Sequence, residues 1–267
     1  MANKQTITDL ARRLIQDGPR KTLPTSRRVR AIHNNTFIVD TTKGIYVWEH
    51  DYYPTLYVPQ AHLKNCQLKN KQDIGGQGKG KAAVAELVVP SPHGGGEATV
   101  DGVLRFDDDK SLGPLAGNVR INFNSISQWL EEDVPIFVHP KDPFKRVDIL
   151  ASQRHIQVKV KGKTVADAAS SMHLFETGLP TRYYLPLASV DPAVLRKSDL
   201  ITRCPYKGEA EYYHVVVDGE ETSNIVWYYR LPTHESSAIA GLVCFYNEKV
   251  DIIIDGELQS RPSTHFA

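Results

Sequence analysis

Hydrophobic and polar residues alternate along much of the chain with the two-residue period of a β-strand. From Ile156 to Lys161 every second residue is apolar, and Lys161-Gly162-Lys163 follows as a tight reversal. Two further apolar runs end in Asp218-Gly219 and Asp255-Gly256, dipeptides that favour two-residue hairpin turns. The pattern predicts a mainly β protein built from compact antiparallel sheets, with few short helices.

Helical spacing is found in only two places. Apolar residues recur at intervals of three and four between Ile7 and Gln16, with Thr6 or Thr8 as the N-cap. A second short helix is predicted over Ser125–Glu132, within the sequence FNSISQWLEE. Helix therefore contributes little to the expected fold.

The second half of the chain repeats the first at a nearly constant offset, which is the strongest structural signal in the sequence. The matched positions are Glu176 with Glu49, Tyr184 with Tyr57, Pro186 with Pro59 and, one residue further apart, Lys207-Gly208 with Lys79-Gly80. A steady offset of this kind is what duplication followed by small insertions and deletions produces. We predict two tandem copies of one β domain.

The repeat also sets the expected domain boundaries. The first β domain is predicted over residues 24–135 and the second over 151–260, with an N-terminal helical segment at 1–23. Residues 136–150 would be the connector. Because this stretch is rich in charged residues and lacks glycine and serine, we expect a salt-bridged joint rather than a loose linker.

Several long motifs resemble a known family. The second copy contains LFETGLPTRYYLP (174–186), TRCPYKG (202–208), IVWYY (225–229) and IAGLVCFYNEKVDI (239–252). They resemble the family catalogued as domain of unknown function 427, also labelled nucleotidyltransferase-like, and WEHDYYPTLYVP in the first copy resembles the N-terminal half of its two-domain members. The resemblance implies a β-tent-like fold, shared with methionine sulfoxide reductase B and the Mss-type zinc proteins, and no established activity.

Metal chemistry is not expected on these residues. The zinc-bearing fold relatives use paired CxxC clamps, whereas Cys66, Cys204 and Cys244 lie far apart in the chain. Nucleotidyltransferases hold two metals with closely spaced carboxylates, but Asp107-Asp108-Asp109 is better explained as a solvated turn. We expect no metal site and no cofactor.

The glycine-rich stretch Gly75–Gly80 superficially suggests a phosphate-binding loop. It lacks the GxxxxGK[ST] pattern and the strand-to-helix context that such a loop needs. A flexible loop is the simpler prediction.

Charge and hydropathy limit the classes of partner. Lys plus Arg number 32 and Asp plus Glu number 31, so no overall field favours nucleic acid or an anionic membrane. No apolar run approaches the roughly 18 residues needed to span a bilayer, and the polar start is no signal peptide. We expect a cytoplasmic protein whose ligand is a small molecule, with no nucleic-acid or membrane partner.

Candidate catalytic residues gather in the second copy. Glu176 could transfer a proton, and Arg182 offers a fork for an anionic or carbonyl oxygen. Neighbouring tyrosines on a strand point to opposite faces, and the repeat favours Tyr184 over Tyr183. The predicted catalytic set is Glu176, Arg182, Tyr184, Cys204 and Lys207.

A second group of residues is suited to substrate binding. Aromatic side chains could form the walls of a pocket for a flat or apolar ligand, and polar groups at a strand end could orient it. These residues are Tyr206, Trp227, Tyr246, Asn247 and Glu248. The alternative is that the aromatic residues belong to the sheet core, and that Cys204 is a small buried hydrophobic residue.

Comparison of the copies places the predicted site in the second domain. The first copy keeps Glu49 and Tyr57 but has Thr55 where Arg182 would be and Gly76 near the position of Cys204. We expect it to cover, pair with or shape the second domain, and a homodimer fits that arrangement.

The functional hypothesis is an enzyme acting on a small organic molecule by general acid–base chemistry, as an isomerase, cyclase, lyase or hydrolase. The alternatives are a non-catalytic binding module with an aromatic cage of Tyr206, Trp227 and Tyr246 and, from the family label alone, nucleotidyl transfer.

Overall fold

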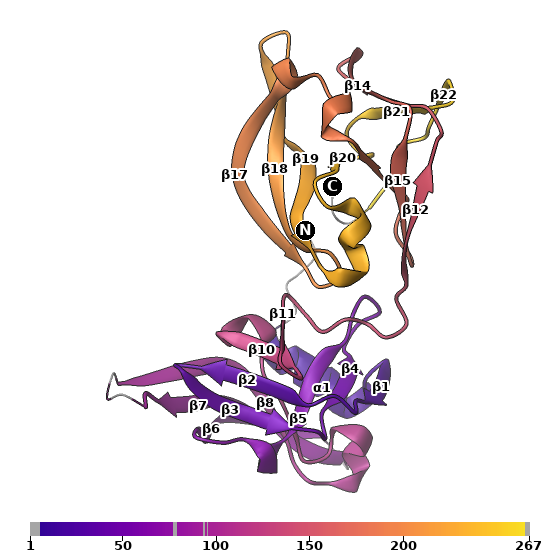
Figure 1. The fold of residues 1–267 in the computed structure, drawn as a ribbon. Helices are drawn as coiled ribbons and strands as arrows, with labels where there is room; N and C mark the ends of the chain where they lie inside the picture. Colours follow the sequence, from indigo (N-terminus) through magenta and orange to yellow (C-terminus); the bar gives the residue numbers. More distant parts are fainter. Residues whose placement is uncertain (1–5, 77–78, 93, 95, 265–267) are drawn as a thin grey trace. The chain divides into compact units, whose positions relative to one another are not determined.

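The chain divides into two compact units between Asp142 and Pro143 (Figure 1). The computed structural model describes residues 6–76, 79–92, 94 and 96–264. The division falls inside the predicted connector, residues 136–150, and strand β12 (Val147–Ser152) already belongs to a sheet of the second unit. No helix in this described part of the chain has the length and apolar character needed to cross a membrane.

Each unit contains one seven-stranded and one four-stranded antiparallel sheet. In the first unit the large sheet has the order β1 (Lys21–Pro24), β4 (Ile45–Trp48), β5 (Thr55–Pro59), β9 (Asn118–Arg120), β8 (Glu97–Phe106), β7 (Lys79–Pro90), β6 (Gln67–Gly76). The small sheet has the order β11 (Val134–Ile136), β10 (Gln128–Glu131), β2 (Val29–His33), β3 (Thr36–Thr41).

The second unit repeats this topology strand for strand. Its large sheet has the order β12, β15 (Ser171–Glu176), β16 (Arg182–Leu185), β20 (Val243–Phe245), β19 (Glu220–Pro232), β18 (Gly208–Val217), β17 (Leu195–Cys204). Its small sheet has the order β14 (Lys163–Ala168), β13 (Ile156–Val160), β21 (Asp251–Ile254), β22 (Glu257–Leu258). The mainly β fold and the tandem duplication are confirmed.

Strand register supports the residue pairing found in the sequence. Tyr57 on β5 lies opposite Arg120 on β9, and Tyr184 on β16 lies opposite Cys244 on β20. Tyr57 and Tyr184 are therefore equivalent, and Cys244 occupies the position of Arg120.

The two faces of each large sheet bury different material. One face packs on the small sheet and forms an aliphatic core, as expected for strands that alternate apolar residues toward a partner sheet. In the first unit the other face packs against helix α1 (Ile7–Asp17) and the 3-10 helix η2 (Lys110–Leu115). In the second unit the equivalent face carries tyrosine and tryptophan, packed with Ile239 of the 3-10 helix η6 (His234–Ile239).

One predicted helix is confirmed and the other is wrong. Helix α1 begins after Thr6, whose side chain accepts a hydrogen bond from the Asp9 amide. Residues 125–132 are instead the end of the 3-10 helix η3 (Phe123–Ser125) and strand β10, which pairs with β2. Trp129 and Glu131 are buried at alternate positions because the two-residue period of the sheet overrides the helical spacing.

The turn predictions have mixed outcomes. Asp218-Gly219 and Asp255-Gly256 connect hairpin strands with positive φ at both residues, as type I′ turns require. The flexible loop predicted for Gly75–Gly80 is wrong at both ends of this stretch, because β6 pairs with β7 as far as the Gly76–Lys79 position. Residues 77–78 lie outside the described residues.

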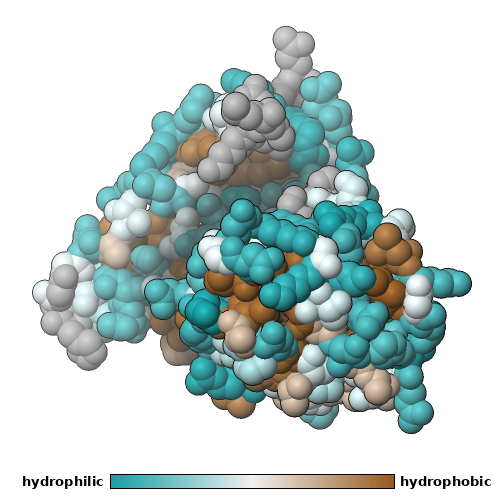
Figure 2. All heavy atoms as spheres, turned by 90° about the horizontal axis from the view of Figure 1, so that it is seen from above, coloured by the Kyte–Doolittle hydropathy of each residue, from teal (hydrophilic) through white to brown (hydrophobic). Residues whose placement is uncertain are grey.

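Hydrophilic side chains cover most of the face seen in Figure 2. Hydrophobic side chains appear between them in small groups. This is the ordinary distribution for the surface of a water-exposed protein.

Candidate functional site

The structure brings Glu176, Cys204 and Lys207, three of the predicted catalytic residues, together in the second unit. Glu176 ends β15, and Lys207 follows β17 at the turn into β18. Lys207 Nζ donates a hydrogen bond to Glu176 Oε2 at 2.6 Å; the Glu176 side chain is buried and that of Lys207 is mostly buried. Burial acts to lower the pKa of Lys207, but the neighbouring Cys204 and Glu176 outweigh burial and raise it. Lys207 is therefore a charged partner of Glu176.

Arg182 has a different partner. Its two terminal nitrogens donate to the two carboxylate oxygens of Glu248, each at 2.7 Å, and Asn247 Oδ1 lies 3.4 Å away. Burial acts to raise the pKa of Glu248, but the Arg182 fork outweighs it and lowers the pKa to about 2. Glu176 and Arg182, both predicted as catalytic, thus belong to two separate ion pairs.

Several of the predicted aromatic residues pack together close to Arg182. Trp227 Nε1 donates to the Tyr184 hydroxyl at 3.0 Å, and the Trp227 and Tyr246 ring centroids lie 4.5 Å apart. The Arg182 guanidinium lies 5.4 Å from the centre of the Trp227 ring, and Tyr206 is buried as well. Arg182 therefore already lies against one face of Trp227, a residue of the predicted aromatic cage.

A cavity of about 200 Å³ lies elsewhere in the second unit. Uncharged residues line it: Pro180, Thr181, Tyr183, Asn247, Val250, Ile252, Gln259, Ser260 and Pro262. Asn247 is the one predicted site residue among them.

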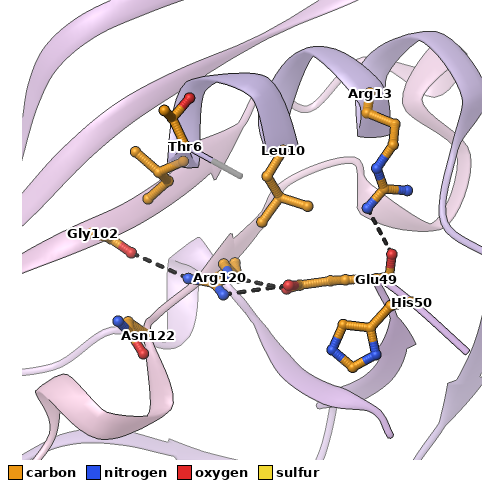
Figure 3. Close-up of a pocket in the computed structure, with 9 residues that line it drawn as sticks. Thr6, Leu10, Arg13, Glu49, His50, Gly102, Arg120 and Asn122 are labelled. Atoms are coloured by element: carbon orange, nitrogen blue, oxygen red, sulfur yellow. Dashed lines mark hydrogen bonds and ion pairs between the residues drawn. The ribbon is translucent and has the colours of Figure 1, made fainter. Parts of the chain in front are cut away.

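A larger cavity, of about 300 Å³, lies in the first unit (Figure 3). It is lined by Thr6, Ile7, Leu10, Arg13, Glu49, His50, Gly102, Arg120 and Asn122. Helix α1 supplies the first residues of this set, and the large sheet with its adjoining loops supplies the rest. We call it the α1 cavity.

Glu49, the counterpart of Glu176, is held firmly in the α1 cavity. Arg120 Nε donates to Glu49 Oε1 at 2.9 Å, and Arg120 Nη2 lies 3.3 Å from Oε2. The Tyr57 hydroxyl also donates to Oε1, at 3.1 Å. Burial acts to lower the pKa of Arg120, but the charge and hydrogen bonds of Glu49 outweigh burial, so the pKa of Arg120 is raised. Burial raises the pKa of Tyr57 well above its ordinary value. A buried carboxylate with a charged guanidinium and a neutral phenol therefore faces the cavity.

Arg13 and His50 add further polar groups to the lining. Arg13 Nη2 donates to the backbone carbonyl of Glu49 at 2.6 Å. His50 Nδ1 accepts from the Tyr52 amide at 3.3 Å, which leaves Nε2 to carry the proton of the neutral ring. Burial and Arg13 lower the pKa of His50, against the opposing effect of Glu49, so the imidazole is neutral near pH 7.

The sequence reasoning missed Arg13, His50, Arg120 and Asn122. A signal was available for Arg120, because it stands between Val119 and Ile121 in a strand. Its side chain must therefore point to the face of the sheet opposite Val119 and Ile121. Because both faces of the sheet are packed, a guanidinium buried there needs a carboxylate partner. Arg13 could not emerge from a comparison of the copies, because α1 has no counterpart in the second unit.

Two remaining predictions concern residues outside these clusters. Among the described residues, no group of three or more His, Cys, Asp and Glu side chains is arranged to hold a metal ion. Asp107 pairs with Arg105 at 2.7 Å, and Asp109 caps η2. The side chain of Lys79, the counterpart of Lys207, lies outside the described side chains.

The fold and the site define a class: a duplicated antiparallel β domain with a buried glutamate–cation pair on the same face of each large sheet. The model of one family, described as a domain of unknown function (DUF427), matches the chain twice, at residues 21–132 and 148–256. The chain therefore belongs to the DUF427 family and carries two copies of its domain. No curated protein matches the chain.

Proposed function

We propose that the protein is an enzyme that acts on a small organic molecule by general acid–base chemistry, with Glu49 of the α1 cavity as the proton-transferring group. The observation that supports this is a buried carboxylate facing a cavity of about 300 Å³, the size of a small-metabolite site. The sequence-based hypothesis placed the same chemistry on Glu176, whose carboxylate pairs with Lys207 and lines neither described cavity.

The two oxygens of Glu49 are suited to different tasks. Oε1 accepts from both Arg120 and Tyr57, which fixes the orientation of the carboxylate. Oε2 accepts a single longer bond from Arg120, so it has a lone pair for a substrate proton. Arg120 would also stabilise negative charge that develops on the substrate.

Two alternatives predict different behaviour. A non-catalytic binding module would bind a small molecule without turnover. Nucleotidyl transfer has the family label as its only support. Neither alternative needs a proton acceptor at Glu49.

The test is exchange of carbon-bound protons with solvent, followed by proton NMR in D2O over a panel of small carboxylic and carbonyl compounds. The wild-type protein should label at least one compound, and Glu49→Gln should slow labelling by about 10²- to 10⁴-fold. Glu49→Asp keeps the charge opposite Arg120 and serves as a second variant if Glu49→Gln folds poorly.

The matched control is Glu176→Gln in the second unit. It should retain exchange if the α1 cavity is the site. Loss of exchange in Glu176→Gln and retention in Glu49→Gln would move the site to the second unit. If the wild-type protein and the variants bind a compound of the panel but none of them catalyses proton exchange, the binding module is favoured.

A further inference from the structure

The charges around the α1 cavity do not cancel. Arg13 and Arg120 face Glu49, while His50 is neutral near pH 7 because burial lowers its pKa. One positive charge is therefore left without a counterion in the lining.

Arg13 carries this excess charge. Arg120 is forked onto Glu49, but Arg13 is anchored by the backbone carbonyl of Glu49, which bears no full charge. No ion pair of Arg13 is found among the described residues. A guanidinium offers five N–H donors, so most of those on Arg13 remain for a ligand.

The remaining lining determines what an anionic ligand would carry. Ile7 and Leu10 of α1 line the same cavity as Arg13, so an apolar group can pack on them. Near Ile7, Asn122 and the Gly102 carbonyl add polar groups, and Arg120 Nη1 reaches that carbonyl only weakly, at 3.5 Å. A second negative charge on the ligand would lie close to Glu49 and be repelled.

We infer that the α1 cavity binds a small organic monoanion, a monocarboxylate whose carboxylate lies on Arg13 and whose apolar part packs on Ile7 and Leu10. Guanidinium–carboxylate pairing is bidentate and charge-assisted, which gives the site its preference. The inference rests on the proposed function for the location of the site and adds the class of substrate.

The experiment titrates the full chain by calorimetry with three probes of similar size: butyrate, butyramide and succinate. Butyrate should bind at least about tenfold more tightly than the neutral amide, because the amide cannot form the charge-assisted pair. Succinate should also bind more weakly than butyrate.

The decisive variants lie next to each other on α1. Arg13→Gln should reduce butyrate affinity to that of butyramide, and Arg13→Lys should give an intermediate value because it keeps the charge and loses the fork. Arg12→Gln is the matched control and should bind like wild type, since Arg12 is exposed and pairs with Asp9. Equal binding of butyrate and butyramide, or wild-type affinity in Arg13→Gln, would overturn the inference.

The design separates this inference from the proposed function. Butyrate binding that depends on Arg13, without exchange activity on any compound, would leave the inference standing and remove the enzyme proposal. Exchange activity on uncharged compounds that is unaffected by Arg13→Gln would do the reverse.

Discussion

At the scale of single residues, the buried glutamate shared by both units is neutralised in two different ways. Arg120 reaches Glu49 from a central strand, whereas Lys207 reaches Glu176 from a hairpin turn. Cys244, which stands in the register position of Arg120, is buried, and burial raises its pKa to about 12. The thiol there is neutral, so the second unit needs a cation from elsewhere.

Removing Arg120 should destabilise the first unit strongly. Arg120→Met leaves the Glu49 carboxylate buried without a cation, which costs about 3–5 kcal/mol of unfolding free energy. The double variant Glu49→Gln/Arg120→Met should recover most of this loss. Urea unfolding curves measure both.

The control for this prediction is the exposed fork of Arg28 on Asp40 in the same unit. Arg28→Met should cost less than about 1 kcal/mol, because exposed ion pairs contribute little. An equal loss in the two single variants would contradict the assignment of Arg120 to a buried, obligatory pair.

The sequence predicted the shared glutamate and tyrosine but not their partners. Glu49 and Glu176 could be paired because duplication preserves spacing along the chain. Which cation meets each carboxylate depends on register between strands far apart in sequence, Tyr57 opposite Arg120 and Tyr184 opposite Cys244. No local pattern contains that information.

At the scale of elements, α1 and β10 show where local pattern succeeds and fails. The apolar spacing and N-cap of α1 are local and were sufficient to predict it. In residues 125–132, Ile126, Trp129 and Leu130 fit helical spacing equally well, and pairing of β10 with β2 decides the outcome. Short apolar segments next to a sheet are therefore predictable only with their partner strand in view.

The N-cap of α1 can be tested directly. Thr6→Ala removes the acceptor for the Asp9 amide and should cost about 1 kcal/mol, so the α1 amides should exchange with solvent about fivefold faster. Hydrogen exchange of the full chain measures this change.

Thr8→Ala is the matched control, since Thr8 lies within the helix and alanine is the better helix former. It should leave exchange unchanged or slow it slightly. Faster exchange in Thr8→Ala than in Thr6→Ala would place the cap at Thr8 instead.

At the scale of the whole molecule, each unit has the cores of a complete domain. We predict that fragments 1–142 and 143–267 each fold alone, because their sheets and cores close within the fragment. Dispersed amide NMR spectra and cooperative urea unfolding would support this expectation. An unfolded fragment would contradict it.

The second unit should lose stability in acid through Glu248. Its pKa of about 2 in the folded state lies below the ordinary 4.5, so its contribution is complete above about pH 4.5 and is lost as the pH falls toward 2. Fragment 143–267 has Trp227 as its single tryptophan, so fluorescence can follow its unfolding at each pH. Glu248→Gln should flatten the loss of stability over this interval, and an unchanged slope would contradict the role of Glu248.

Helix α1 ends at Asp17, before the first residue matched by the family model at position 21. One wall of the α1 cavity is therefore supplied by a helix outside the repeated domain, while the remaining walls come from the domain itself. Substitutions in the helix would then alter which molecule is accepted without disturbing Glu49, whose carboxylate is held by Arg120 of β9. Substitutions confined to Ile7, Leu10 and Arg13 would then be a direct route to changing ligand preference.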